Sequence, residues 1–200
     1  MLGDTVHEIR DGRINCEDGY FDLVVSNQVF EHVEDLEAVL EEINRVMKDD
    51  AVIMCLFATR DVIREDHIGI PFVHWFSKGS RVRYPYTLAM RSMGLGYYKR
   101  DKSRTEWTTD QLEWLDRYTH YRKKREIVRS LSRYFHLSAF EEDYIRFRLE
   151  DNRMLKPFVP LITLPAVLPL TRFLFRKLGG MVLLARKWNG CQGLDTTRGT

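Results

Sequence analysis

Histidines and basic side chains are the residues of this sequence best suited to chemistry. His67 and His74 lie in a stretch dense in aromatic residues. Because an unperturbed imidazole titrates near neutrality, either one could act as a general base. Their aromatic surroundings also fit two core histidines. Arg81, Arg83 and Tyr84 follow in a basic loop, where they could bind an anionic substrate or form a solvated surface.

Metal sites and nucleophile motifs are not predicted. No His/Cys/Asp/Glu cluster has the spacing of metal ligands, and no Gly-x-Ser-x-Gly sequence occurs. The cysteines, Cys16, Cys55 and Cys191, are odd in number and scattered. This usage predicts reduced thiols and a cytoplasmic protein.

The elements that must position these side chains centre on residues 20–33. Residues 21–25 predict a buried strand, an apolar stripe at helical spacing begins at Val33, and residues 51–57 predict a second buried strand. Strand, helix and strand form a parallel β-α-β unit, in which ligands lie beyond the carboxyl ends of the strands. One such end is formed by Ser26, Asn27 and Gln28. Alternatively, these residues only end the strand and cap the next helix.

The same segment resembles a known family. Phe-Asp-Leu-Val-Val, then Glu-His-Val, then a helix ending in Arg-Val-Met-Lys and an apolar strand are similar to the second half of a class I S-adenosylmethionine-dependent methyltransferase of the type 11 group. The likeness covers about residues 6–60. It implies an α/β fold with a partial Rossmann-like sheet, the C-terminal half of the methyltransferase sheet. It also implies S-adenosyl-L-methionine as cofactor and a small-molecule acceptor.

The resemblance implies cofactor-binding residues as well. In the family, an acidic residue at a strand end contacts the adenine amino group, and the next amide contacts the ring. Asp11 and Gly12 fit these roles, with a one-residue offset onto Arg10 as the alternative. Glu31 and His32 match the family's Glu-His-Val, a pair that more often orders the loop than takes part in chemistry. The strand end at Ser26, Asn27 and Gln28 would face the methionine part of the donor.

One motif of the family is missing. Its Gly-rich turn, an acidic residue followed by Gly-x-Gly, approaches the cofactor closely, and nothing before Asp11 has that form. We therefore expect an N-terminally truncated methyltransferase, with a degenerate, non-catalytic protein as the alternative. The family's helix-to-strand turn is also replaced by Lys-Asp-Asp-Ala at residues 48–51, which still favours a turn.

Charge is unevenly distributed along the chain. Residues 1–66 hold 6 Lys/Arg and 17 Asp/Glu, whereas residues 67–136 hold 15 and 6. The basic middle segment either meets an anionic group or pairs with the acidic first third. Aromatic residues lie among its basic ones, so an RNA-binding module over residues 78–136 is the alternative function.

The rest of the chain is predicted in three parts. Residues 61–136 are expected to be a helical and aromatic insertion that acts as a substrate lid. Its helices are expected at 86–93, at 108–121 with Thr108 and Gln111 as a capping box, and over an apolar stripe that ends at Phe135. Residues 137–188 should hold the last strands, at 137–149 and 180–187, and an apolar cap. Residues 189–200 are expected to be a disordered tail.

The apolar cap, residues 157–171, has an alternative interpretation. It is too short and too rich in proline to span a bilayer, so we expect it to be buried over the sheet. Shallow contact with a membrane, together with a lipid-like substrate, is the alternative.

Overall fold

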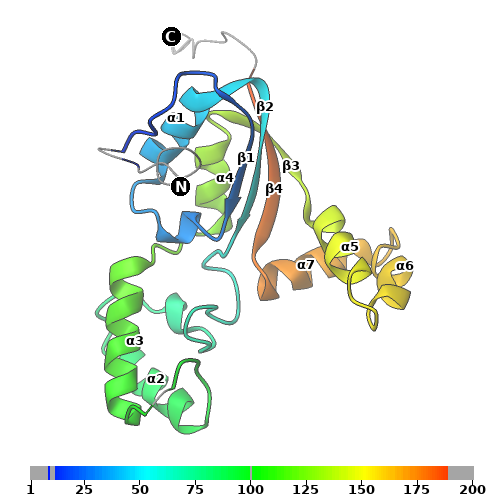
Figure 1. Cartoon of the computed structure of the whole chain (residues 1–200). Coiled ribbons are helices and arrows are strands. Elements are labelled where there is room, and N and C mark those ends of the chain that lie inside the picture. Colours follow the sequence, from blue (N-terminus) through cyan, green and yellow to red (C-terminus); the bar gives the residue numbers. More distant parts are fainter. Residues whose placement is uncertain (1–8, 10–11, 100, 189–200) are drawn as a thin grey trace, which may run out of the picture.

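The computed structural model describes residues 9, 12–99 and 101–188 (Figure 1). Within them the chain forms an α/β fold around a sheet with the strand order β1-β2-β4-β3. β1 (Phe21–Asn27) is parallel to β2 (Met47–Phe57). β4 (Met181–Lys187) is antiparallel to both β2 and β3 (Phe135–Ala139). The expected α/β fold is therefore confirmed, whereas the tail at 189–200 lies outside the described residues.

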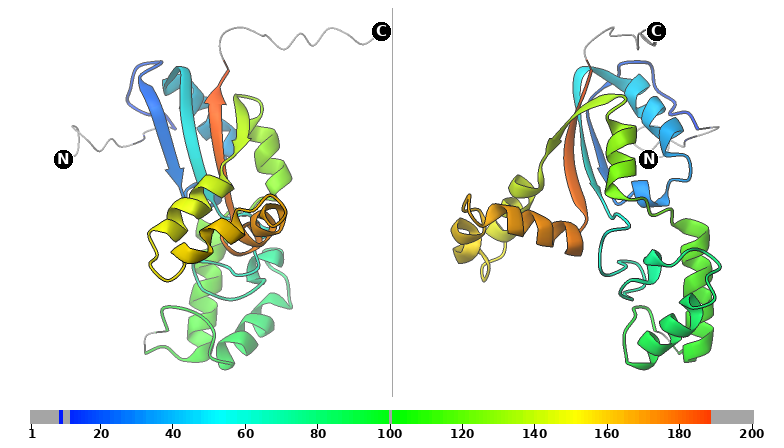
Figure 2. Two further views of the ribbon diagram at one scale, coloured as in Figure 1. Left: turned by 90° about the vertical axis from the view of Figure 1, so that its right-hand side faces the viewer. Right: turned by 180° about the vertical axis from the view of Figure 1, so that it is seen from behind.

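One face of the sheet is covered by α1 (Leu36–Val46) and α4 (Lys124–Leu131), as Figure 2 shows in its right-hand view. α1 begins after Asp35, whose carboxylate accepts a hydrogen bond from the Ala38 amide at 3.0 Å. Side chains of both helices and of the central strands form the main core, among them Leu40, Ile43, Ile53, Phe57, Ile127 and Leu131.

The opposite face is open along the upper part of the strands (Figure 2, left). Leu23 and Val25 of β1 point to it and are 60% and 55% exposed. Their partners on β2, Val52 and Met54, are only partly buried. A parallel pair of strands usually has both faces covered, so this apolar face is unusual.

A helical lobe lies beyond the ends of β1 and β2 (Figure 1). It contains a short 3-10 turn (Val73–Trp75), α2 (Arg83–Ser92) and α3 (Arg104–Tyr118). The capping box expected at Thr108 is wrong, because the Glu106 amide instead donates to the Ser103 side chain, 3.2 Å away. Thr108 is buried inside α3, where its hydroxyl donates to the Arg104 carbonyl. The lobe has its own core, formed by Ile68, Ile70, Val73, Trp107, Leu112 and Leu115.

A helical arm connects β3 to β4. It consists of α5 (Glu141–Glu150), a 3-10 turn (Lys156–Phe158), α6 (Val159–Ile162) and α7 (Leu168–Leu178). The strand expected at 137–149 is therefore wrong beyond Ala139. Phe140, Tyr144 and Phe147 in fact have helical spacing, and three acidic residues in the first turn suit a helix N-terminus. The expected helical stripe also ends too late, since Phe135 begins β3.

The apolar part of the arm is not the buried cap that we expected. Of its residues 157–171, Val159 alone is buried, and all of α7 is at least partly exposed. No helix among the described residues is long and apolar enough to cross a bilayer. The physical reason for the exposure is visible in Figure 1, where the arm projects away from the sheet instead of lying on it.

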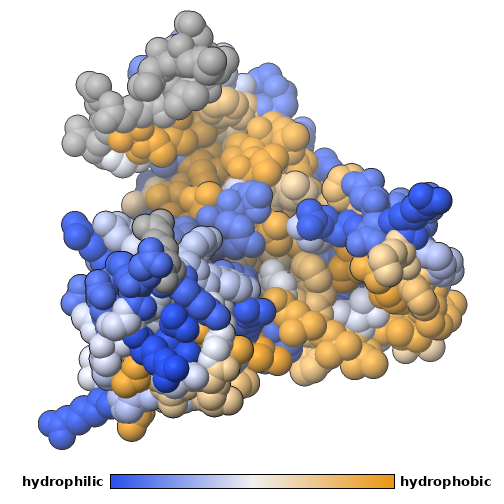
Figure 3. Space-filling view, turned by 60° about the horizontal axis from the view of Figure 1, so that its bottom comes forward, coloured by the Kyte–Doolittle hydropathy of each residue, from blue (hydrophilic) through white to orange (hydrophobic). Residues whose placement is uncertain are grey.

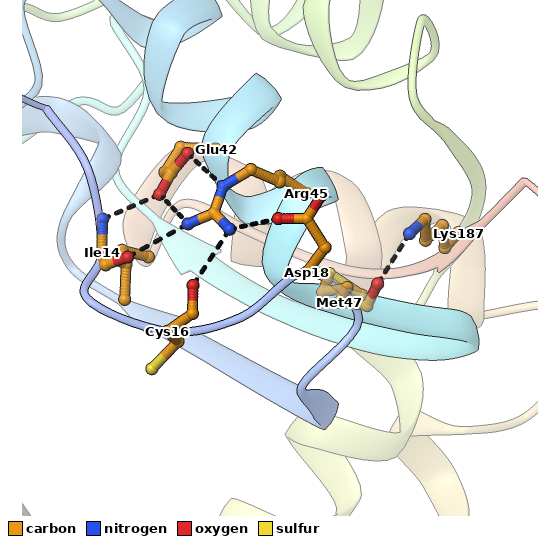
Figure 4. A network of polar contacts seen from close by, with 7 residues as sticks. All are labelled: Ile14, Cys16, Asp18, Glu42, Arg45, Met47 and Lys187. Carbon is orange, nitrogen blue, oxygen red and sulfur yellow. Dashed lines mark hydrogen bonds and ion pairs between the residues drawn. The ribbon is translucent and has the colours of Figure 1, made fainter.

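The segment before β1 is held by Arg45 of α1 (Figure 4). Its guanidinium donates to the carbonyls of Ile14 and Cys16, each 3.0 Å away, and to the carboxylates of Asp18 and Glu42. The hydrogen bonds from Arg45 lower the pKa of Glu42 to about 2. We expected a turn at residues 48–51, but this segment belongs to β2. The pairing of β2 with β1 is irregular there, and Asp50 has a φ of 66°.

Candidate active site

The candidate site is formed at the carboxyl ends of β1 and β2, the edge that the β-α-β pattern predicts. After β1, Gln28 adopts a φ of 53° and the chain enters a 3-10 turn (Phe30–His32) that carries Glu31 and His32. After β2, residues 58–66 lead into the lobe and to His67. The segments that follow β1 and β2 therefore bring Glu31, His32 and His67 to the same edge of the sheet.

His32 and His67 face each other through their Nε2 atoms, which are 3.1 Å apart. The Nδ1 atom of His32 lies 2.6 Å from the Tyr118 carbonyl oxygen. The Nδ1 atom of His67 lies 2.7 Å from a carboxylate oxygen of Glu65. Because both of these partners accept hydrogen bonds, each Nδ1 carries a proton and donates it.

Glu65 is the buried anchor of this arrangement, with none of its side chain exposed. Its carboxylate accepts hydrogen bonds from the Ile68 amide at 2.6 Å and from the Tyr121 hydroxyl at 2.5 Å, in addition to the one from His67. Burial alone would raise the pKa of Glu65, but these three donors lower it. The hydrogen bond to Glu65 in turn raises the pKa of His67.

Glu31 is buried beside the histidine pair, with 2% of its surface exposed. Neither of its carboxylate oxygens has a hydrogen-bond partner among the described residues. Burial raises the pKa of Glu31. Its main chain is fixed, because the His120 amide donates to the Glu31 carbonyl at 2.6 Å. The backbone of Ala58 and of Glu31 itself opposes the rise in pKa only in part. A buried carboxylate with so little hydrogen bonding is costly when ionised, so it marks a place where a ligand would be stabilising.

His74 is also buried, and its ring nitrogens have no partner within the described part of the chain. Burial lowers the pKa of His74 to about 4, so it is neutral at pH 7. Its ring lies 4.9 Å from that of Tyr121. Of the two histidines proposed as bases, His67 is the one with a carboxylate partner and access to solvent.

A cavity of about 390 Å³ adjoins His67. It is lined by an aromatic wall, an amide and a cation, and the lining residues are His67, Tyr98, Lys102, Gln111 and Trp114. The Trp114 and His67 rings are 5.2 Å apart. An acceptor held against Trp114 would thus lie next to the imidazole of His67.

Of the predicted cofactor-binding residues, Ser26, Asn27, Gln28 and His32 lie at this end of β1. Ser26 is buried and its hydroxyl lacks a partner among the described residues, whereas Asn27 and Gln28 are exposed. Gly12 is exposed with a φ of 74°. Asp11 lies outside the described residues.

The predicted substrate-binding residues lie elsewhere in the lobe. Arg83 is buried at the start of α2 and forms an ion pair with Asp116 of α3, so it joins these two helices. Arg81 and Tyr84 are exposed. The cavity next to His67 has Lys102 as its cationic lining residue.

Sequence reasoning missed the residues that complete the site, namely Glu65, Tyr121, Trp114 and Gln111. The pair Glu65 and His67, two positions apart, was a signal that could have been used. Tyr121 is 56 positions from Glu65, and nothing local connects them.

Comparison with known proteins supports the resemblance at the start of the chain. Residues 5–55 match the family described as a methyltransferase domain. This match confirms the likeness to S-adenosylmethionine-dependent methyltransferases over that segment. A comparison with curated proteins finds no match.

Several solved structures are similar to this chain. One is an S-adenosylmethionine-dependent methyltransferase from Mesorhizobium loti, with 15% identity, a TM-score of 0.40, and coverage of 85% of this chain and 63% of that one. A second, from Archaeoglobus fulgidus, has 15% identity, a TM-score of 0.37, and coverage of 86% and 61%.

A third is phosphoethanolamine N-methyltransferase 2 from Haemonchus contortus, with 10% identity, a TM-score of 0.39, and coverage of 88% and 35%. The chain spans less than two thirds of the length of each of these three proteins.

Proposed function

We propose that this chain is part of a methyltransferase that moves a methyl group from S-adenosyl-L-methionine to a small-molecule acceptor. The observation that carries the proposal is the pairing of Glu65 with His67 next to a cavity, at the strand ends of a segment that matches a methyltransferase domain. The wider α/β sheet agrees with it. The donor, its acceptor and the reaction are proposals for this chain.

The donor side of the site fits in part. Ser26 supplies a buried hydroxyl without a partner among the described residues at the end of β1, and Asn27 and Gln28 are exposed beside it in sequence. These are polar groups free to bind the methionine part of the donor. When bound, S-adenosyl-L-methionine supplies a methyl group already activated by its sulfonium.

The chain's own residues would position the acceptor and take its proton. Trp114 and Gln111 would hold the acceptor in the cavity, with its oxygen or nitrogen directed at the methyl group that the donor would supply. The proton lost from the acceptor passes to the Nε2 atom of His67. Glu65 stabilises the resulting imidazolium through Nδ1, which is a general-base arrangement.

The test separates donor binding from chemistry. We expect S-adenosylhomocysteine to shift the amide NMR signals of Ser26, Asn27 and Gln28. His67→Gln should keep these shifts but lose the transfer of labelled methyl groups to a panel of phenols, amines and phosphorylated amines. His136→Gln, which alters an exposed histidine on β3, is the matched control. The absence of any saturable shift with the unmodified chain would overturn the proposal.

We also propose that the helical arm contacts an anionic membrane surface, which favours a lipid-like acceptor. Large apolar side chains cover the arm, and Phe147, Phe158, Leu161, Leu170, Phe173 and Leu174 are all exposed. Basic residues lie among them in the sequence. Figure 3 shows hydrophobic and hydrophilic side chains side by side on the right-hand part of the molecule, where the arm lies. Over the whole arm, residues 141–178, there are seven Lys/Arg and five Asp/Glu. Apolar area with excess positive charge is suited to anionic lipid headgroups.

Vesicle flotation tests the arm directly. The chain should float with vesicles rich in phosphatidylserine and much less with purely phosphatidylcholine vesicles. Phe158→Ser combined with Phe173→Ser should remove the flotation. Met93→Ser, which changes an exposed apolar residue at the end of α2, should not. If the double variant floats as well as the unmodified chain, membrane contact through the arm is ruled out.

The structure gives less support to the RNA-binding alternative. Base stacking requires exposed aromatic faces. Trp107 is fully buried in the lobe, and the Tyr121 hydroxyl is bonded to Glu65. Of the aromatic residues on α3, Tyr118 is the most exposed. Only part of the aromatic set is therefore available for stacking on bases.

A further inference from the structure

We propose that Glu31, His32 and His67 form a binding site for a divalent transition-metal ion, with Zn²⁺ as the best-suited ion. One ligand atom from each residue lies within 4.8 Å of the other two. Two imidazoles and a carboxylate are a donor set that Zn²⁺ prefers. The three residues come from two loops, after β1 and after β2, so the site exists only in the folded chain.

The arrangement of the two histidines is the first argument. Both Nδ1 atoms donate, that of His32 to the Tyr118 carbonyl and that of His67 to Glu65. The two Nε2 atoms then face each other 3.1 Å apart. Lone pairs at this distance repel unless a proton or a cation lies between them. Around a tetrahedral Zn²⁺ with bonds of about 2.0–2.1 Å, two ligand nitrogens are about 3.3–3.4 Å apart, close to this separation.

The carboxylate of Glu31 is the second and independent argument. It is 2% exposed, and neither oxygen has a partner among the described residues. A shared proton between the histidines would explain their contact but would leave the Glu31 carboxylate with only its own amide and the Ala58 backbone to favour its charge. A divalent cation accounts for both observations, because it binds the two lone pairs and neutralises the carboxylate.

The surroundings of the histidines have the form of a metal site's outer shell. Histidines that bind metals generally donate their second ring nitrogen to a carboxylate or a carbonyl, which fixes the tautomer and the ring orientation. Glu65 does this for His67, and Glu65 is itself held by Tyr121 and by the Ile68 amide. The Tyr118 carbonyl, at the end of α3, does it for His32.

Metal binding would change the role of His67. Its Nε2 lone pair cannot hold a metal and accept a proton at the same time. With the metal bound, three protein ligands leave a fourth position open, as in catalytic zinc sites. A water or an acceptor hydroxyl at that position would have a lowered pKa and would lose its proton without His67 as a base.

Calorimetric titration with Zn²⁺ tests the site without any measurement of activity. We expect one ion per chain, and Co²⁺ at the same site should give the visible absorption of a low-coordinate ion. His32→Ala and His67→Ala should each weaken binding by at least tenfold, and Glu31→Gln should weaken it as well. His136→Ala and Cys16→Ser, which remove an exposed imidazole and a thiol elsewhere, should leave binding unchanged.

If removal of His67 prevents folding, a second variant can still test the metal site. His32 is exposed, so His32→Gln should fold normally and still lose the ion. Glu65→Gln should weaken binding by about 10–100-fold through its effect on His67. No binding by the unmodified chain, or binding that His32→Gln leaves intact, would overturn the proposal. Neither outcome bears on whether the chain binds S-adenosylhomocysteine.

Discussion

The Nε2 atoms of His32 and His67 lie 3.1 Å apart, although 35 positions separate the two residues in the sequence. His32 belongs to the turn after β1, and His67 follows the loop after β2. The parallel pairing of these strands places both ends at one edge of the sheet, and Glu65 and the Tyr118 carbonyl then orient the two rings. The candidate site is thus a product of sheet topology combined with two hydrogen bonds that orient the rings.

Replacing Glu65 should lower the pKa of His67 in the metal-free chain. His67 has a raised pKa in the folded state because of its hydrogen bond to Glu65. Its contribution to stability is therefore present below the unfolded pKa of about 6.5 and is lost as pH rises through the folded pKa. In Glu65→Gln the NMR titration of His67 should move to lower pH. An unchanged midpoint would show that Glu65 does not set the charge of His67.

His74 should make the chain less stable in mild acid. Burial lowers its folded pKa to about 4, below its unfolded value, so its contribution is present at pH 7 and is lost as pH falls through the range from 6.5 to 4. Linkage predicts a loss of about 2 kcal/mol between pH 7 and pH 5 from this group. The free energy of unfolding is measured in urea at pH 7 and pH 5, for the unmodified chain and for His74→Phe. The difference between the two proteins isolates the contribution of His74. Equal pH dependence in both proteins would contradict it.

Gly96→Ala should destabilise the lobe core. Gly96 has a φ of 96°, and a Cβ atom there would lie 2.7 Å from the Trp107 ring, which is fully buried. We expect a loss of roughly 2–4 kcal/mol in the free energy of unfolding, from backbone strain plus displacement of the ring. Gly79→Ala is the matched control, because Gly79 has a φ of 77° but nothing within 4 Å of the added atom. Chemical denaturation of both variants should show the larger loss for Gly96.

Asp35→Ala should weaken the start of α1. The Asp35 carboxylate accepts the Ala38 amide hydrogen bond at 3.0 Å, and loss of such a cap costs about 1 kcal/mol. Glu34→Ala changes the neighbouring exposed carboxylate without removing a cap and serves as the control. Thermal unfolding followed by circular dichroism measures both. If the two variants unfold at the same temperature, the cap does not stabilise the helix.

The sequence by itself determined the elements whose patterns are local. The apolar runs that became β1 and β2, and the stripe that became α1, follow from side-chain spacing alone. The edge of the sheet that holds the candidate site follows from the order of these elements. At residues 140–147 the aromatic spacing was helical and was misinterpreted as a strand. Aromatic residue types favour a strand there, whereas their period indicates the helix that forms.

Tertiary structure alone decided which side chains meet. The Tyr121 hydroxyl donates to Glu65, 56 positions away. Arg83 pairs with Asp116, 33 positions away, and does not line the cavity next to His67. The apolar run at 157–171 predicted burial, but composition does not say whether another element covers it, and here the arm projects from the sheet. Contacts of this kind depend on how loops place whole elements, and that information is not contained in any local period.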